Sequence, residues 1–535
     1  MSQRRRKFWG WGWEDGGPTA EQQERLAQLL AARFGLDSIV IEPSPRLEEI
    51  QLRQPRIAPP PSLASICSID PYERAAHTYG KSFRDVVRAL RRSFPNPPDL
   101  VAFPEREEHV VTLLDWCTQA RVAAVPYGGG SSVVGGVEPP RNDAYRATLS
   151  IDLRALSRVL EVDRTSRAAR IQAGVYGPAL EDQLRPYGYT LRHFPQSFEF
   201  SSLGGWIATR SGGHFATLYT HIDDFVESLR VVTPSGIVES RRLPGSGAGP
   251  SPDRLFIGSE GILGIITEAW MRLQDRPRFR NTASVTFDDF AAGVAAARAV
   301  SQSGLYPSNC RLLDAGEALS AGAGSEVVLI VAFESADHSL DAWMARALEC
   351  CRDHGGHVPA DAGKTRTDDG GAREGSAGAW RQSFLAAPYL RDVLVAMGMV
   401  SDTFETAITW DRFADFHAGV MAAAREAAER ICGAASVTCR FTHLYPDGAA
   451  PYYTILAPGK KGSQLQQWDE IKAAASEAVL RLGGTITHHH AVGRDHRTWY
   501  DRQRPDGFAA ALVAAKSALD PGGVLNPGVL IDPRP

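Results

Sequence analysis

The first residues that could do chemistry form a glycine-rich loop, Val125–Ser132, in which a short apolar stretch runs into three glycines and two serines. Glycines let backbone N–H groups converge into a concave nest that can hold a phosphate or pyrophosphate. The loop lacks the Gly-Lys-Ser/Thr ending of a P-loop, and no Gly-x-Gly-x-x-Gly opens a helix here, so triphosphate and Rossmann sites are not indicated. Taken alone, the loop fits a tight turn as well as a phosphate cradle.

Three further segments, Gln196–Gly205, Thr209–Gly212 and Gly258–Ile266, follow the loop in order. Together the four resemble the flavin-binding segments of the vanillyl-alcohol-oxidase and p-cresol-methylhydroxylase superfamily. Small residues permit close backbone approach, and hydroxyls donate hydrogen bonds to a flavin and its phosphates. The resemblance implies FAD contacts from Pro126, Tyr127, Gly128, Gly129, Gly130, Ser131, Ser132, Gln196, Ser197, Phe198, Glu199, Phe200, Ser201, Ser202, Thr209, Arg210, Ser211, Gly212, Glu260, Gly261, Ile262, Leu263, Gly264, Ile265 and Ile266.

The way in which FAD is held follows from the same resemblance. Several relatives in that superfamily attach the flavin through a histidine in the glycine loop, whereas Ser131 stands at the corresponding position here. We therefore expect noncovalent FAD. Attachment through His193 or His214 stays an open alternative.

The second half of the chain narrows the family. Over about residues 65 to 530 the sequence resembles alkyldihydroxyacetonephosphate synthases, most clearly in Cys310–Asp314, Tyr389–Asp392, Ser401–Thr406, Cys439–Thr442, Tyr445–Tyr452 and His488–Gly493. The resemblance implies an acid/base role for Tyr452, substrate binding by Arg391 and a requirement for Arg311. It also implies an essential histidine triplet, made of His488, His489 and His490.

These roles are chemically reasonable, and each has a structural alternative. A phenol with a pKa near 10 needs nearby cations or hydrogen bonds before it exchanges protons near neutrality. An arginine binds phosphate through a bidentate fork. Arg311 and Arg391 could instead be structural ion-pair residues, and Tyr452 could simply line a cleft.

The histidine triplet allows two interpretations. If it lies on a strand, His488 and His490 face one way and His489 the other, so at most two share a cleft from one face. A metal site is the rival interpretation. We expect no metal, because no acidic or cysteine ligand stands at a persuasive spacing.

The family's reaction replaces the acyl chain of acyl-dihydroxyacetone phosphate with a fatty alcohol and uses FAD as a covalent partner without net redox change. In that family a longer insertion after the counterpart of Cys310–Asp314 helps to form the gate of a lipid tunnel and a membrane-facing surface. Here only a Gly/Ala-rich link, Ala315–Ser325, joins Asp314 to the next strand, so the sequence offers no counterpart of the gate. Ala491 also follows the triplet where the family usually has glycine.

Two other functions share parts of this pattern. An FAD-dependent 2-hydroxy-acid dehydrogenase would use the same flavin lobe and arginines that hold a carboxylate. Such enzymes often carry a metal-binding histidine pair and a Glu-His-Gly segment near the C-terminus, and this sequence has neither. A flavin-binding module without catalysis is the third possibility, against which Tyr452, Arg311, Arg391 and the three histidines argue.

Hydrophobic periodicity predicts the elements that must position these residues. Leu26, Leu29, Leu30 and Phe34 predict a helix over residues 19–34 that stops at Gly35. Between residues 100 and 273, short β-rich segments alternate with glycines, which indicates an α+β lobe. Beyond Arg276, strands such as Val327–Phe333 alternate with Ala-rich helical stretches at 289–302, 340–353, 412–432 and 467–482.

We therefore expect an α+β protein with a two-lobed vanillyl-alcohol-oxidase-type FAD-binding domain, a sheet-and-helix cap domain and an N-terminal helical extension. A chain of 535 residues exceeds what a single core usually supports. The expected boundaries are 1–95 for the extension, 96–276 for the FAD-binding domain, 277–500 for the cap or substrate domain and 501–535 for a segment that returns to the FAD lobe.

Composition limits the remaining partners. The net charge of −4 gives no general attraction for nucleic acid, and the basic run Arg4–Lys7 is expected to be a solvated tail. Irregularly spaced cysteines, the absence of a long apolar run and a C-terminus without a peroxisomal signal favour a cytoplasmic protein. We expect a small-molecule or lipid substrate with a phosphate or carboxylate. Peripheral membrane contact and a homodimer stay open.

Overall fold

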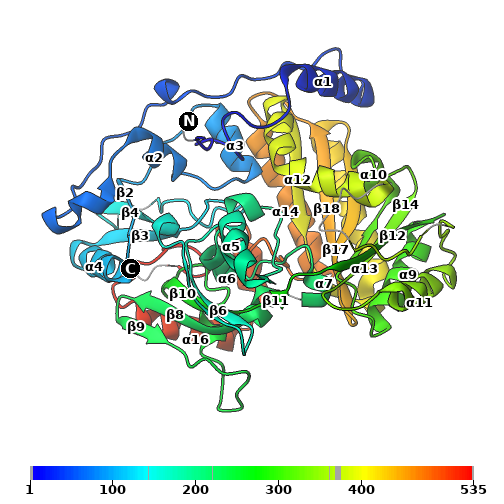
Figure 1. The fold of residues 1–535 in the computed structure, drawn as a ribbon. Coiled ribbons are helices and arrows are strands. Elements are labelled where there is room, and N and C mark those ends of the chain that lie inside the picture. Colours follow the sequence, from blue (N-terminus) through cyan, green and yellow to red (C-terminus); the bar gives the residue numbers. More distant parts are fainter. Residues whose placement is uncertain (1–3, 142–143, 220, 361, 368–374, 533–535) are drawn as a thin grey trace.

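The computed structural model describes residues 4–141, 144–219, 221–360, 362–367 and 375–532. Three larger sheets organise these residues into two α+β lobes, and helices cover the sheets (Figure 1). The expected fold class is therefore confirmed. No helix in the described ranges is long and apolar enough to cross a membrane.

The first sheet carries the glycine loop. Its strands lie in the order β1 (Cys67–Ser68), β2 (Leu100–Ala102), β4 (Ala147–Asp152) and β3 (Val122–Tyr127), and β2, β4 and β3 run parallel. Such strands are buried on both faces, which explains their continuous apolar runs. Helix α4 (Glu107–Ala120) packs against them. The glycine loop follows the carboxyl end of β3, the edge at which parallel sheets bind ligands.

The second sheet completes the FAD lobe. It is antiparallel, in the order β5 (Val159–Asp163), β6 (Ala168–Gln172), β10 (Ile265–Arg272), β8 (Val226–Thr233) and β9 (Gly236–Glu239). Helices α5 (Gly177–Leu184), α6 (Leu203–Thr209) and α16 (Asp506–Leu519) contribute to its core. The C-terminal segment reaches the first sheet, where Ala124 donates its N–H to the Val524 carbonyl at 2.8 Å.

The third sheet forms the second lobe. Its antiparallel path is β12 (Phe279–Phe287), β14 (Val327–Ser335), β13 (Asn309–Leu313), β17 (Ser436–Leu444), β18 (Gly448–Pro458) and β15 (Met399–Glu405), with β16 (Ile408–Thr409) paired to β18. The core on one face includes α9 (Phe290–Gln302), α11 (Asp341–Arg352), α13 (Trp410–Cys432) and α14 (Gln464–Arg481). All four helices match the predicted Ala-rich stretches.

The opposite face of the third sheet is turned towards α10 (Ala315–Ser320) and α12 (Gly375–Ala396). The sequence predicted only a link where α10 lies. Asp314 caps this helix by accepting the Glu317 N–H at 2.7 Å, so one short helical turn replaces the expected coil.

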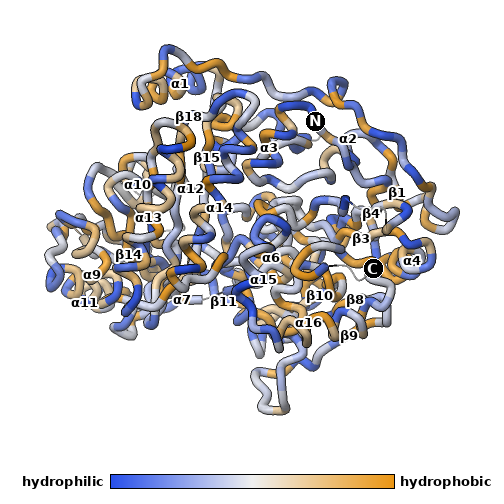
Figure 2. Tube along the Cα trace, turned by 180° about the vertical axis from the view of Figure 1, so that it is seen from behind, coloured by the Kyte–Doolittle hydropathy of each residue, from blue (hydrophilic) through white to orange (hydrophobic). Residues whose placement is uncertain are grey.

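Helix α1 (Ala20–Phe34) has the ends that its sequence predicts. Thr19 and Gln22 form a capping box, and Gly35 ends the helix in the left-handed region with φ 65°. Its buried face packs against α12 and β15. The chain then runs along the outside of the molecule to β1, with polar and apolar residues interspersed (Figures 1 and 2).

The prediction of a solvated basic tail is wrong. Residues 5–14 fold back as a hairpin, in which Lys7 donates its N–H to the Gly12 carbonyl and Glu14 to that of Arg5, both at 2.9 Å. The Trp11 N–H donates to the Asp392 carboxylate at 2.7 Å, and Lys7 lies 3.6 Å from the same carboxylate. Lys7, in the run of charges, thus has a buried partner that lies 385 residues later in the sequence.

Candidate active site

One cavity of about 840 Å³ connects the two lobes. The glycine loop lines it, and so do Tyr452, Arg311, Arg391, His489 and His490. Residues that lie far apart in the sequence therefore face one space.

Most of the residues expected to contact FAD line this cavity. They are Pro126, Tyr127, Gly128, Gly129, Gly130, Ser131, Ser132, Gln196, Ser197, Ser201, Ser202, Thr209, Ser211, Gly212, Glu260, Gly261, Gly264, Ile265 and Ile266. The cavity lining does not include Phe198, Glu199, Phe200, Arg210, Ile262 or Leu263.

Those exceptions have structural roles instead. The Phe198 ring stacks on Phe194 with 4.4 Å between ring centroids, and Glu199 accepts the Trp13 indole N–H at 2.6 Å. Arg210 donates to Asp223 at 2.9 Å. Phe200 packs against the N-terminal hairpin, and Ile262 and Leu263 belong to the core of the FAD lobe. Within a binding segment, neighbouring side chains point to different sides, which spacing in the sequence does not reveal.

The cavity wall fits the FAD that the segments imply. The Ser202 hydroxyl is buried in this wall without a hydrogen-bond partner among the described residues, so it can bind a ligand oxygen. A Cβ on Gly128 would lie 2.2 Å from that hydroxyl, and a Cβ on Gly129 would lie 1.8 Å from the Phe200 carbonyl oxygen. Only glycine lets this loop lie so close to the 200–202 segment.

Neither candidate attachment histidine lies in the glycine loop. His193 is buried, and its Nε2 contacts the Ser211 hydroxyl at 2.8 Å. His214 lines the cavity, and its Nε2 contacts the Asn309 amide at 2.7 Å.

Tyr452 lies at the centre of the site. Its hydroxyl donates to Thr403 at 2.8 Å, and the guanidinium of Arg440 lies 4.0 Å from the centre of its ring. Arg440 is held in turn by Glu317 of α10. Burial raises the pKa of the Tyr452 phenol, and the charge of Arg440 opposes that rise. The phenol is therefore neutral and surrounded by the cations that a proton exchange requires.

Arg391 is placed to bind an anion. Its Nη2 donates to Asp402 at 2.8 Å, while its buried Nε has no hydrogen-bond partner among the described residues. Asp402 also accepts the Trp468 indole N–H at 2.6 Å, which fixes the carboxylate and hence the guanidinium. Arg311, buried on β13, lines the same cavity. One edge of Arg391 is thus anchored and another remains for a phosphate oxygen.

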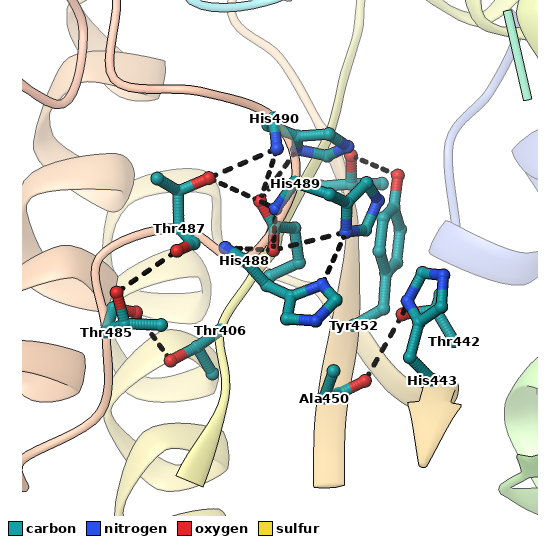
Figure 3. A network of polar contacts seen from close by, with 12 residues as sticks. Thr406, Thr442, His443, Ala450, Tyr452, Thr485, Thr487, His488, His489 and His490 are labelled. Atoms are coloured by element: carbon teal, nitrogen blue, oxygen red, sulfur yellow. Dashed lines mark hydrogen bonds and ion pairs between the residues drawn. The ribbon is translucent and has the colours of Figure 1, made fainter. Parts of the chain in front are cut away.

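The histidine triplet is not on a strand, so the alternation expected for a strand is wrong. Residues 488–490 form a bend beside Tyr452 (Figure 3). Glu405 accepts the backbone N–H groups of His488 at 2.6 Å, His489 at 3.2 Å and His490 at 2.9 Å, and the Thr487 hydroxyl at 2.6 Å. His489 and His490 face the cavity, whereas His488 does not line it.

The imidazoles of the triplet are neutral. Burial, together with the neighbouring imidazoles, lowers the pKa of His488 and His489 well below the usual value. The Nε2 atom of His488 lies 2.8 Å from the Tyr445 hydroxyl and 2.9 Å from His221 Nε2, and its Nδ1 lies 3.0 Å from His489 Nδ1. A neutral imidazole accepts a hydrogen bond at one nitrogen and donates one at the other. The hydrogen-bonded side chains can therefore orient His489 and pass a proton to or from it.

Three imidazoles could hold a metal ion. Ligand nitrogens of His443, His488 and His489 lie within 4.8 Å of one another. However, His443 uses both ring nitrogens, one at 3.0 Å from the Gly213 carbonyl and the other at 3.1 Å from the Thr442 hydroxyl. A metal bound to His443 would have to displace one of these contacts, so hydrogen bonding accounts for the present geometry.

Glu260 joins the flavin segment to the triplet. Its carboxylate accepts the N–H groups of Val492 and Gly493, each at 2.8 Å, and burial raises its pKa to about 7. Ala491, just before them, has φ 72°, a left-handed conformation that favours glycine. The left-handed backbone at this position therefore explains why the family usually has glycine there.

Sequence reasoning missed Glu405, Arg440, His443, Tyr445 and His221. A signal for Arg440 was present, because Arg311, Arg440 and Tyr452 alternate with buried apolar neighbours such as Leu312 and Phe441 on the strands of the third sheet. A period of two places these polar residues on the face opposite the core. No local signal identifies Glu405, whose partners follow 82 or more residues later.

Replacing Glu405 with glutamine should lower the free energy of unfolding and make it depend less on pH in the acid range. Burial alone would raise the pKa of Glu405, but the hydrogen bonds donated by the Thr487 hydroxyl and the backbone of the triplet lower it to about 2. A depressed folded-state pKa contributes stability above the ordinary carboxyl pKa that is lost as the pH falls towards 2. We expect the variant to lose a few kcal/mol at pH 7, at about 1.4 kcal/mol per pKa unit, with the difference shrinking below about pH 4.

Denaturant unfolding from pH 7 to acid measures this difference, with Glu48→Gln as the control at an exposed carboxylate. A difference between Glu405→Gln and the parent that does not change with pH would contradict an ionised, hydrogen-bonded Glu405.

Comparison with known proteins agrees with this geometry. Family models described as "FAD binding domain" and "FAD linked oxidases, C-terminal domain" match residues 98–240 and 276–530. An alkyldihydroxyacetonephosphate synthase from Dictyostelium discoideum is 32% identical over 485 residues, which cover 86% of this chain and 78% of that protein.

Solved structures extend the comparison over the whole fold. An alkyldihydroxyacetonephosphate synthase matches with a TM-score of 0.79 and 26% identity over 98% of each chain. The p-cresol methylhydroxylase structure with substrate bound shares the fold, with a TM-score of 0.67 and 16% identity over 88% of this chain and 95% of that one. The chain binds FAD and belongs to the alkyldihydroxyacetonephosphate synthase family.

Proposed function

We propose that this enzyme exchanges the acyl chain of an acyl-dihydroxyacetone phosphate for a fatty alcohol. The observation that carries the proposal is one cavity with three kinds of lining. The lining includes a glycine loop for FAD, the polar side chains of Tyr452, Arg311 and Arg391, and an apolar wall of leucines.

The apolar wall favours a lipid substrate over a 2-hydroxy acid. The apolar part of the cavity lining includes Leu26, Leu29 and Leu30 of α1, Leu319 of α10 and Leu394 of α12. Leu29 and Leu319 are also 61% and 64% exposed, so this part of the lining reaches the surface. A small hydroxy acid needs no such extension, whereas a long alkyl or acyl chain gains about 0.8 kcal/mol for each buried methylene. Helices α1, α10 and α12 supply the lipid path for which the short link offered no counterpart.

The exchange is redox-neutral. The bond between the dihydroxyacetone carbon and the ester oxygen breaks, and the acyl chain leaves as a fatty acid. The oxygen of the fatty alcohol forms the new bond to that carbon and loses its proton. When bound, FAD supplies a transient covalent partner for the dihydroxyacetone unit.

The side chains divide the remaining work. Arg391 and Arg311 hold the phosphate, and Tyr452 Oη exchanges a proton with the substrate. His489 and His490 bind and orient the reacting groups in the cavity, and His488 positions His489. Arg440 keeps the Tyr452 ring in place and favours its charged form.

We further propose that residues 96–276 act as the FAD-binding domain and 277–500 as the substrate domain, with 1–95 and 501–535 joining them. FAD is held noncovalently, because Ser131 takes the place of an attachment histidine in the loop. Histidine residues serve flavin and substrate rather than a metal.

Replacing Arg391 with alanine tests the phosphate role. We expect KM for the phosphate-bearing substrate to rise about 30-fold or more, because truncating one member of a buried charge pair costs about 2–5 kcal/mol. Arg391→Lys keeps the charge but loses the bidentate fork, so its KM should lie between that of the parent and that of Arg391→Ala. Steady-state kinetics with separate kcat and KM decide the matter. An unchanged KM for Arg391→Ala would make Arg391 a structural partner of Asp402 only.

A further inference from the structure

A second cavity, of about 730 Å³, lies behind the glycine loop. The N-terminal hairpin forms one side of it and helix α2 (Pro71–Ala76) another, where the N-terminus of the chain lies beside α2 and α3 (Phe83–Leu90) (Figure 1). Its charged lining is mainly cationic, with Asp70 and Glu73 facing Arg4, Arg5, Arg6, Lys7, Lys81 and Arg154. The function proposed above uses none of these residues.

Lys81 is the most informative residue of this lining. Its side chain is buried, with 8% of the residue exposed, yet among the described residues no carboxylate or hydrogen-bond acceptor lies within bonding distance of its ammonium. Burial lowers the pKa of Lys81 to about 8; the negative charges of Asp392 and Asp85 oppose this shift, and the positive charges of Arg6 and Lys7 add to it. Buried lysines are normally paired directly, whereas Asp392 and Asp85 act on Lys81 only through charge at longer range, so its ammonium can bind a further anion.

Two further cations of the cavity are only partly satisfied. The Arg6 guanidinium lies 4.3 Å from the ring centre of Tyr176, and its hydrogen bond to the Glu199 carbonyl is long, at 3.4 Å. Lys7 lies 3.6 Å from Asp392. The other cations have closer partners: Arg4 pairs with Asp15, Arg5 lies over the Tyr72 ring and Arg154 pairs with Asp152.

This cavity is separate from the space for FAD. Trp11, Tyr127, Gly129 and Ser131 line both cavities, so the glycine loop together with Trp11 forms the wall between them. Lys81 lies on the far side of that wall, where its backbone N–H donates to the Ser132 carbonyl at 2.6 Å, and it does not line the first cavity. A ligand here would not displace FAD or the substrate.

We propose that the second cavity binds a phosphate group, free or carried by a small organic ester, between Lys81, Lys7 and Arg6. A tetrahedral dianion satisfies a buried ammonium and a guanidinium at once. The volume exceeds what a phosphate ion alone fills, and Phe103, Tyr127 and Tyr176 offer aromatic surface to the body of an ester.

The test uses FAD-loaded Arg391→Ala protein, in which anion binding at the first cavity is weakened, and titrates inorganic phosphate in phosphate-free buffer by calorimetry. We expect one equivalent of phosphate to bind and to raise the midpoint temperature of thermal unfolding. Adding Lys81→Met should weaken binding about 30-fold or more and remove the thermal shift. Phenyl phosphate is the second probe. Tighter binding of phenyl phosphate identifies an ester as the ligand, and equal binding identifies free phosphate.

Lys461→Met, at an exposed lysine, controls for the loss of one charge and should bind phosphate normally. Lys81→Met should fold at least as well as its parent without phosphate, because it removes an unpaired buried charge while keeping the stem. Unchanged phosphate binding by Lys81→Met would overturn the proposal. The proposal would also be overturned if the parent bound no phosphate and Lys81→Met lost its FAD. The cations would then support FAD binding through the glycine loop instead of binding phosphate.

Discussion

Tyr452→Phe lowers kcat by about 10² to 10⁴-fold and leaves FAD content and substrate KM nearly unchanged, because a general acid/base is typically worth that much in rate. The substitution removes only the hydroxyl that donates to Thr403 at 2.8 Å. Phenylalanine keeps the ring beneath Arg440, so the packing of the third sheet is retained. Steady-state kinetics of alkyl-for-acyl exchange measure the effect.

Tyr453→Phe is the matched control. The neighbouring side chain points to the opposite face of β18, where its buried hydroxyl lies 3.3 Å from His417 Nδ1. This control should retain activity. A decrease of less than about tenfold in Tyr452→Phe would demote Tyr452 to a residue that lines the cavity.

Gly129→Ala empties the FAD site. The added Cβ would lie 1.8 Å from the Phe200 carbonyl oxygen and 2.8 Å from Ser201 Cα, so backbone must move. Overpacking of this kind costs about 1–3 kcal/mol or more, which corresponds to a loss of flavin of about tenfold or more. Flavin released by acid, measured against protein, gives the content, and its release also tests noncovalent attachment.

Gly507→Ala controls for the exchange of glycine, since a Cβ there meets nothing within 4 Å. It should retain FAD and unfold at the same temperature as the parent or higher. Normal flavin content in Gly129→Ala would show that the loop is merely a turn.

Elements with strong local signals could be predicted from the sequence. The leucines of α1 with Gly35, and the apolar run of β14, define structure within a few residues, because periodicity and capping act locally. Helix α12 was not predicted. Its Gly- and Ala-rich sequence and internal Pro388 give little amphipathic pattern, and its position depends on contacts with α1, α3 and β15.

The candidate site was predictable only where a motif carried it. Tyr452, Arg391 and the triplet could be placed by resemblance, but their partners could not. Asp392 binds Trp11 across 381 residues, and Glu405 binds the amides of the triplet across 83 or more. Such contacts arise from tertiary packing. For this reason the local sequence predicted a solvated tail for Arg4–Lys7, although these residues line a cavity.

The central claim is redox-neutral exchange at the FAD-bearing cavity. The most direct measurement mixes FAD-loaded enzyme anaerobically with acyl-dihydroxyacetone phosphate and a radiolabelled long-chain alcohol, and follows both flavin absorbance and labelled product. Our account predicts one labelled ether product for each fatty acid released, with the flavin oxidised at the end. Failure to form the ether, together with bleaching of the flavin by a 2-hydroxy acid, would contradict it.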